Sequence, residues 1–221
     1  MEIVPRFWFQ FAKLQHVYLI RGAAFAFLIA LGVGVAPAHA ANHSKVHVYL
    51  IRGLANVFSL GMDEIASKLQ AEGIPASVSN HLAWGSVAAD AAEEYKSGRV
   101  RTLIFVGHSA GADAIASICA QLGRQGIPVR LAISLDPGLS RMPASGHVQR
   151  YINYYVSTGI GHTIGKAPDF RGNFSNVDVA QMPGVGHFNI DKNASMEARV
   201  LRDIHAALGT AAQAAPAAAA R

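Results

Sequence analysis

The segment 102–111, with the sequence TLIFVGHSAG, constrains the fold of this chain more than any other. A short β-branched apolar run enters a turn of small residues, and the Ala-rich pattern ADAIASICAQL follows, which predicts a strand, a sharp turn and a helix. Glycines stand at 107 and 111 because a side chain at either position would collide with the neighbouring strand or helix. Ser109, at the apex, is therefore predicted to project from the edge of a sheet.

Ser109 stands where a hydroxyl group can act as a nucleophile. The first backbone N–H groups of a helix have no partner within the helix, so negative charge is stabilised beside them. The N–H of Ala110 is accordingly a candidate donor to the oxygen of a carbonyl that Ser109 attacks. An ordinary Gly/Ser turn between a strand and a helix is the alternative interpretation of this motif when it is taken alone.

Strand and helix patterns alternate on both sides of this motif. In chain order they are strand 45–51, helix 59–71 with Ser59 as its N-cap, strand 75–79, helix 86–97, strand 101–106, helix 110–122, strands 129–135, 151–156 and 177–181, and helix 195–208. Strands that alternate with helices predict an α/β fold with a doubly wound, mostly parallel sheet of about six strands and helices on both faces.

The 221 residues divide into three predicted parts. Residues 1–40 contain early basic residues, an apolar run at 22–36 and small residues before a cut between Ala40 and Ala41, which is the pattern of a secretory signal peptide. An uncleaved membrane anchor is the alternative. Residues 41–208 form the predicted folded domain, and residues 209–221 form an Ala-rich tail that is predicted to be disordered. The protein is then periplasmic or secreted, with membrane contact only if the leader stays uncleaved.

Charge and cysteine content narrow the class of protein. The formal net charge is +5 and the basic residues are scattered, so the sequence predicts no nucleic-acid-binding surface. The single cysteine, Cys119, forms no internal disulfide, and its place on a predicted helix suits a small buried apolar residue. The hydrophobic residues, 51% of the chain, must then hold an exported domain together by core packing alone.

A nucleophilic serine needs a base within hydrogen-bond reach and an acid that orients the base. His187 is the candidate base, because it lies in the Gly-rich loop PGVGHFNID just before the final predicted helix. Asp136 is the candidate acid, because it comes at the end of the predicted strand 129–135, which follows the helix 110–122. Adjacent parallel strands end at one edge of the sheet. Asp169 is the alternative acid, and Asp178 is a further rival. Asp136 also suits a turn aspartate that accepts backbone N–H groups.

The loop after the first predicted strand is the candidate source of a second oxyanion donor. Gly53 permits a close backbone approach there, which would place the N–H of Leu54 beside that of Ala110. Three aromatic residues in loops or at edges suit either an acyl pocket or the periphery of the core, namely Phe58, Trp84 and Phe188.

Over roughly residues 45–208, the sequence resembles the α/β-hydrolase fold superfamily. The resemblance lies in the segments TLIFVGHSAGADAIA, RGLANVFSLGMDEIASKL, ISLDPG and GVGHFNID. Arg52 departs from the family, which usually has histidine before the glycine of the oxyanion loop, and no segment is long enough for a lid. The resemblance implies a small, lidless serine hydrolase with no metal or organic cofactor that acts on small or medium acyl esters or thioesters. It assigns the triad Ser109, Asp136 and His187, and the oxyanion donors Leu54 and Ala110.

Two other functional classes remain open from the sequence. The first is a binding module that keeps the α/β-hydrolase fold without its chemistry. The second is a metal-dependent hydrolase, although no HxxxH or CxxC spacing supports it. Its candidate ligands are His147, His162, Asp169 and His187.

Overall fold

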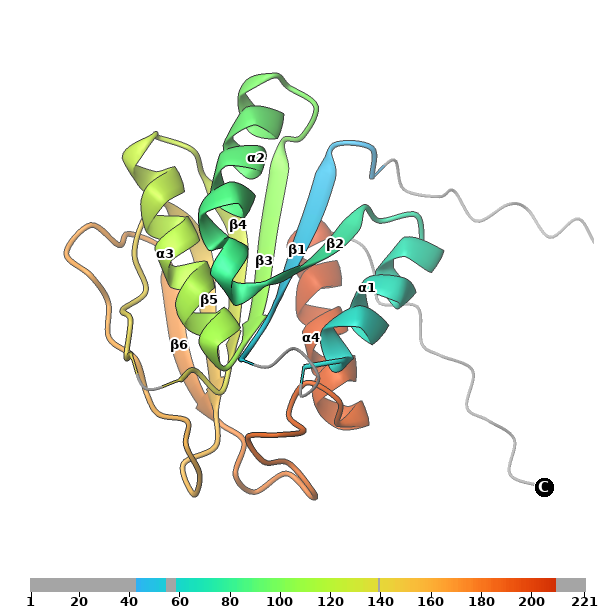
Figure 1. Ribbon diagram of the computed structural model, residues 1–221, viewed down its shortest axis with the longest axis vertical. Helices are drawn as coiled ribbons and strands as arrows, with labels where there is room; N and C mark the ends of the chain where they lie inside the picture. Colours follow the sequence, from blue (N-terminus) through green and yellow to red (C-terminus); the bar gives the residue numbers. More distant parts are fainter. Residues whose placement is uncertain (1–42, 55–58, 139, 210–221) are drawn as a thin grey trace, which may run out of the picture. The chain divides into compact units, whose positions relative to one another are not determined.

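The computed structural model describes residues 43–54, 59–138 and 140–209 (Figure 1). The predicted signal peptide at 1–40, nearly all of the predicted tail at 209–221 and the aromatic candidate Phe58 lie outside the described residues. Within the described ranges, no helix is both long enough and apolar enough to cross a membrane.

Six strands form one sheet in the order β2-β1-β3-β4-β5-β6, and every neighbouring pair is parallel. The strands are β1 (Val46–Arg52), β2 (Ala76–Asn80), β3 (Thr102–His108), β4 (Val129–Leu135), β5 (Val148–Tyr155) and β6 (Asn173–Asp178). The predicted sheet of about six mostly parallel strands is confirmed. The strands β5 and β6 begin earlier than predicted, because their first residues are largely polar and exposed and show no apolar run.

Helices cover both faces of the sheet, as predicted (Figure 1). They are α1 (Gly61–Ala71), α2 (Trp84–Lys96), α3 (Ala110–Arg124) and α4 (Ala194–Leu208), with a 3-10 turn at His81–Ala83. On one face, Phe105 of β3 packs in a cluster with residues of α2 and α3. On the other face, Ile104 and Val106 of the same strand pack with residues of α1 and α4. The alternation of side chains along one buried strand thus builds both halves of the core.

Ser59 does not cap the first helix, so this prediction is wrong. The N-cap position of α1 is Leu60, which makes no side-chain cap bond. The Ser59 Oγ instead accepts the Gly53 N–H at 3.0 Å and hydrogen-bonds to the His108 Nδ1 at 2.8 Å. These tertiary contacts engage the hydroxyl that a local cap would use. A carboxylate distant in the sequence, Asp191, accepts the N–H of Gly61 at the start of α1 instead.

The turn at residues 107–111, between β3 and α3, is called the elbow below. Its two glycines are packed directly against backbone atoms. A Cβ atom at Gly107 would lie 2.2 Å from the carbonyl oxygen of Gly111. A Cβ atom at Gly111 would lie 2.1 Å from the carbonyl oxygen of Ile51 in β1. The helix α3 therefore approaches the central strands more closely than any side chain would allow, and this approach fixes the position of the residue at the apex.

Gly111→Ala is expected to lower the free energy of unfolding by about 3 kcal/mol, because the added methyl group must displace the backbone of β1. Gly85→Ala is the matched control, because nothing lies within 4 Å of a Cβ atom at that position of α2. The control should leave stability unchanged or raise it by about 0.5 kcal/mol, since alanine favours the helix. Denaturant unfolding of both variants measures the difference. Equal stability of Gly111→Ala and the wild type would contradict the close packing.

Candidate active site

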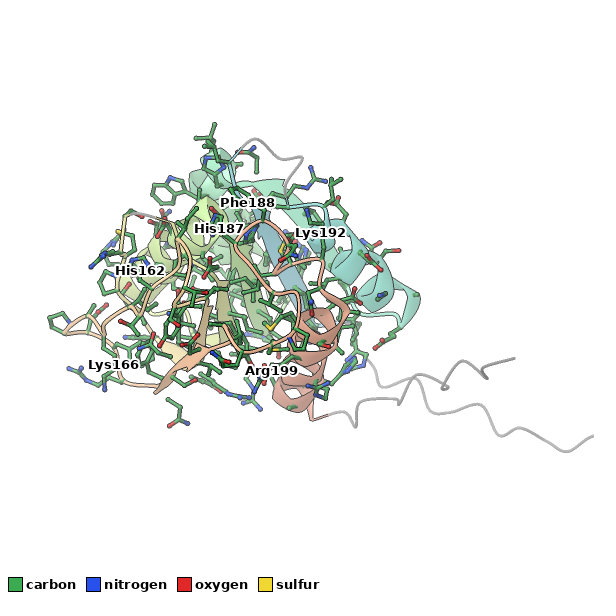
Figure 2. The ribbon with its side chains drawn as sticks, turned by 90° about the horizontal axis from the view of Figure 1, so that it is seen from below. His162, Lys166, His187, Phe188, Lys192 and Arg199 are labelled. Atoms are coloured by element: carbon green, nitrogen blue, oxygen red, sulfur yellow. The ribbon has the colours of Figure 1, made fainter. Side chains whose placement is uncertain are left out.

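Ser109 and Asp136 start from adjacent strand ends. Ser109 directly follows β3 and Asp136 directly follows β4. These strands pair in parallel with His108 opposite Leu135, which places the two following residues side by side at the carboxyl-terminal edge of the sheet. Figure 2 looks onto this edge, where His187 and Phe188 lie close together and His162 lies to one side.

Ser109 has a backbone conformation that is uncommon for a residue with a side chain. Its φ is 54° and its ψ is −121°. Its N–H donates to the carbonyl oxygen of Leu135 at 3.0 Å, and its own carbonyl oxygen accepts the N–H of Ala112 at 2.9 Å. A strained conformation of this kind costs about 1–3 kcal/mol and persists only where the surrounding structure imposes it. The close packing of α3 and the bond to β4 impose it here.

The structure brings together the three side chains that the sequence predicts as a triad. The Ser109 Oγ lies 3.1 Å from the His187 Nε2, and the His187 Nδ1 lies 2.6 Å from the Asp136 Oδ2. An ionised carboxylate can only accept, so the hydrogen of a neutral His187 ring is on Nδ1. The Nε2 lone pair then faces the Ser109 hydroxyl. In this tautomer, His187 is able to take the proton of Ser109.

Asp136 is fully buried, and each of its two carboxylate oxygens has a hydrogen-bond partner. The Asp136 Oδ1 accepts the N–H of Val156 at 2.6 Å, while Oδ2 faces His187. The loop after β5 lies directly against the carboxylate, since a Cβ atom at Gly161 would fall 1.5 Å from Oδ1. A buried charge is stable only when it is paired and hydrogen-bonded. The two acceptor contacts meet that requirement and fix the orientation of the carboxylate.

The two rival acids, Asp169 and Asp178, accept hydrogen bonds from backbone N–H groups away from His187. The Asp169 Oδ2 accepts the N–H of Gly146 at 3.0 Å. The Asp178 Oδ1 accepts the N–H of Ala180 at 2.9 Å, at the end of β6. The structure therefore places Asp136, rather than Asp169, at His187.

The four residues named above as candidate metal ligands do not form a cluster in the described part of the chain. Within the described ranges of the chain, no group of three or more His, Cys, Asp or Glu side chains is arranged to hold a metal ion. His187 contacts Ser109 and Asp136, whereas Asp169 contacts Gly146.

The loop after β1 passes directly beside the nucleophile. A Cβ atom at Gly53 would lie 3.0 Å from the Ser109 Cβ and 2.9 Å from the carbonyl oxygen of His108. Leu54 follows at once and is exposed. Ala110 is the first residue of α3, so its N–H has no acceptor within the helix. The backbones of both predicted oxyanion donors, Leu54 and Ala110, thus start next to Ser109. Their role as donors stays a prediction.

A buried polar cluster behind the nucleophile was not predicted. His108 hydrogen-bonds through Nδ1 to the Ser59 Oγ at 2.8 Å and through Nε2 to the carbonyl oxygen of His187 at 2.7 Å. The Asp191 Oδ1 lies 4.0 Å from the His108 Nδ1. Burial lowers the pKa of His108 and raises the pKa of Asp191. The only signal in the sequence was the place of His108 next to Ser109, and nothing marked Asp191.

Exposed apolar side chains lie at the edge of the sheet that carries the site. The large hydrophobic residues that are exposed in the described part of the chain all lie in segments at the carboxyl-terminal edge of the sheet: Leu54, Leu60, Leu82, Trp84, Met142, Ile160 and Phe188. Of the aromatic candidates, Trp84 is 39% exposed and Phe188 is 61% exposed, so neither belongs to the core. The Phe188 ring lies 5.2 Å from the His187 ring (Figure 2).

The fold and the site together define an α/β-hydrolase architecture. A serine stands at a strained turn between a strand and a helix of a doubly wound parallel sheet, and its aspartate and histidine neighbours follow in that chain order. The resemblance in the sequence is thus confirmed at the level of the fold.

Comparison with solved structures finds similar chains with low identity. Human thioesterase 2 is 11% identical over 74% of this chain and 96% of that chain, with a TM-score of 0.48. Acetyl xylan esterase is 12% identical over 75% and 99%, with a TM-score of 0.45. The type II thioesterase YbtT of the yersiniabactin pathway is 13% identical over 75% and 95%, with a TM-score of 0.41. No family model and no curated protein matches the sequence.

Proposed function

We propose that this protein is a serine hydrolase that cleaves ester or thioester bonds through an acyl-enzyme. The observation that carries the proposal is the continuous hydrogen-bond chain from Ser109 through His187 to Asp136 at a strained turn. A strained turn stores free energy that a merely structural loop does not need. A buried carboxylate aimed at the far nitrogen of an imidazole is the arrangement that activates a serine.

The proposed reaction uses only groups of this chain and water. The Ser109 Oγ attacks the carbonyl carbon while its proton passes to the His187 Nε2, and Asp136 stabilises the resulting imidazolium. The N–H groups of Leu54 and Ala110 stabilise the negative charge on the carbonyl oxygen. The tetrahedral intermediate expels an alcohol or a thiol, which takes the proton from His187. Water, deprotonated by His187, then attacks the acyl-enzyme, releases the acid and restores Ser109.

Fluorophosphonate labelling of the purified chain tests this proposal without knowledge of the substrate. Such probes react with a serine whose base and oxyanion site are assembled, so we expect a single adduct, on Ser109, by intact mass and peptide mapping. A chelator should leave the labelling rate unchanged, which separates this mechanism from a metal-dependent one. If folded protein forms no adduct, the binding module becomes the preferred function.

The exposed ring of Phe188, whose centroid lies 5.2 Å from that of the His187 ring, supports a substrate with an apolar acyl group. Phe188→Ser is expected to lower kcat/KM for hexanoyl and butyryl esters by about tenfold, because the side chain beside His187 contacts the acyl chain. The acetyl ester should be hydrolysed at nearly the wild-type rate. Leu82→Ser is the matched control, since Leu82 is exposed at the same edge but follows the edge strand β2. An equal loss for all three esters would contradict an acyl contact.

We also propose that the protein is exported and that residues 1–40 are removed. The support is the sequence pattern of the leader. N-terminal sequencing of the protein from the periplasm or the medium should begin at Ala41. A full-length chain retained in the membrane would show an uncleaved anchor instead.

A further inference from the structure

We propose that His108 is a positioning residue, whose buried ring fastens the loops of the oxyanion donor and of the base to the nucleophile. This inference rests on the proposed function. The main chain of His108 directly precedes Ser109, so the ring is attached to the elbow itself. Its two nitrogens contact one residue on each of two other loops, Ser59 on one and His187 on the other. The three segments of the candidate site thus meet at one side chain.

The hydrogen-bond directions follow from the chemistry of the partners. The carbonyl oxygen of His187 can only accept, so the His108 Nε2, at 2.7 Å, carries the hydrogen. In the neutral ring, Nδ1 then has a lone pair, and it accepts the Ser59 hydroxyl at 2.8 Å. The Ser59 Oγ in turn accepts the N–H of Gly53 at 3.0 Å. One directed chain therefore runs from Gly53 through Ser59 and His108 to His187, and every member is satisfied.

Each end of this chain holds a group that the reaction needs in place. Gly53 precedes Leu54, whose N–H is the second proposed oxyanion donor. The other end is the main chain of His187, whose ring must stay 3.1 Å from the Ser109 Oγ. Ser59 and His108 are each 1% exposed, so water does not compete for these bonds. A shift of about 1 Å in either loop would misalign the reacting groups and cost about a hundredfold in rate.

The neutral ring is the form that the surroundings favour. Burial is the largest effect on the His108 pKa and lowers it, and the positive form of His187 opposes protonation as well. The carboxylate of Asp191, the hydrogen bond to the carbonyl oxygen of His187 and the carboxylate of Asp136 act in the opposite direction and raise the pKa. A protonated ring would donate from both nitrogens and leave the Ser59 hydroxyl without its acceptor. Low pH therefore reverses the bond to Ser59, whose oxygen would accept from Nδ1 while its hydrogen loses the acceptor, and leaves the contact with His187 intact.

Two substitutions of His108 separate its two contacts. In His108→Gln, the amide nitrogen reaches the position of Nε2 and still donates to the carbonyl of His187. In His108→Asn, the shorter amide reaches the position of Nδ1 and keeps only the contact with Ser59. The measurement is the second-order rate of fluorophosphonate labelling of Ser109 in the full chain. His205→Asn is the control, because His205 is also a buried histidine and bonds to Glu72 at 2.6 Å.

The expected order is wild type, then His108→Gln, then His108→Asn. We expect about a tenfold to hundredfold loss for His108→Asn, about a threefold loss for His108→Gln and no loss for His205→Asn. Rescue by glutamine shows that the contact with His187 sets the rate, since a purely structural role would not rank the two amides by reach. Wild-type rates in both His108 variants would overturn the proposal. An unlabelled wild type would instead overturn the proposed function, and this inference with it.

A second measurement decides the matter if the His108 variants do not fold. Nitrogen-15 spectra of the wild-type histidine rings report which nitrogen is protonated. At neutral pH, we expect the His108 ring to be neutral with its hydrogen on Nε2. A hydrogen on Nδ1, or a charged ring, would contradict the directed chain and overturn the proposal.

Discussion

Ser109→Ala is expected to remove all fluorophosphonate labelling and to lower kcat for ester hydrolysis by about 10⁶-fold. The alanine has no hydroxyl to attack the carbonyl, and His187 then has no proton to accept. The residual rate would come from the oxyanion donors and substrate binding alone. Labelling followed by peptide mapping, together with hydrolysis of a chromogenic ester, measures both effects. Substantial turnover by this variant would place the nucleophile elsewhere.

Ser117→Ala is the matched control in α3, the helix that begins directly after Ser109. The Ser117 hydroxyl donates to the carbonyl oxygen of Asp113 within α3 and takes no part in the site. Its removal should change neither labelling nor hydrolysis. Loss of labelling in this variant would show that truncation of a nearby serine is enough to disturb the elbow. The loss of labelling in Ser109→Ala would then not identify the nucleophile.

Ser109→Gly separates catalysis from strain at the same position. Glycine adopts the φ of 54° without the steric cost that serine bears. The free energy of unfolding should therefore rise by about 1 kcal/mol while activity is lost. Denaturant unfolding of the alanine and glycine variants, compared with the wild type, checks this. Equal stability of the two variants would mean that the elbow is not strained.

The local pattern of apolar and polar residues predicts most of the strands and helices. The strands β1, β3 and β4 consist mostly of buried apolar residues, and α3 begins at a turn bounded by Gly107 and Gly111, so their places follow from the sequence. The strand β6 is an edge strand with polar, mostly exposed residues, and its predicted start was wrong for that reason. Apolar periodicity identifies buried elements best, because burial is what imposes the pattern.

The parallel topology of the sheet predicts that Ser109 and Asp136 lie close together. It does not predict contacts between loops that are distant in the sequence. A parallel sheet brings the ends of neighbouring strands together, so a residue after β3 and a residue after β4 must lie close. The role of Ser59 was mistaken because its partner, His108, lies far along the chain, and only the folded loops bring them together. Asp191 escaped notice for the same reason.

Asp136→Asn is expected to lower kcat by about 10⁴-fold while the fold is preserved. The introduced amide would keep its oxygen on the N–H of Val156, where the Asp136 Oδ1 now accepts at 2.6 Å. Its NH₂ group would then face the His187 Nδ1 and donate to it. This moves the ring hydrogen to Nε2, which would donate to the Ser109 Oγ and be unable to take its proton.

Asp169→Asn decides between the two candidate acids. Its amide oxygen can keep the bond to the N–H of Gly146 that the carboxylate now makes, so both activity and stability should match the wild type. Steady-state hydrolysis and thermal unfolding of the two amide variants give the comparison. Loss of activity in Asp169→Asn, with Asp136→Asn unaffected, would transfer the acid role to Asp169. The geometry argues against that outcome, because only one carboxylate can set the tautomer of His187, and the carboxylate 2.6 Å from its Nδ1 is that of Asp136.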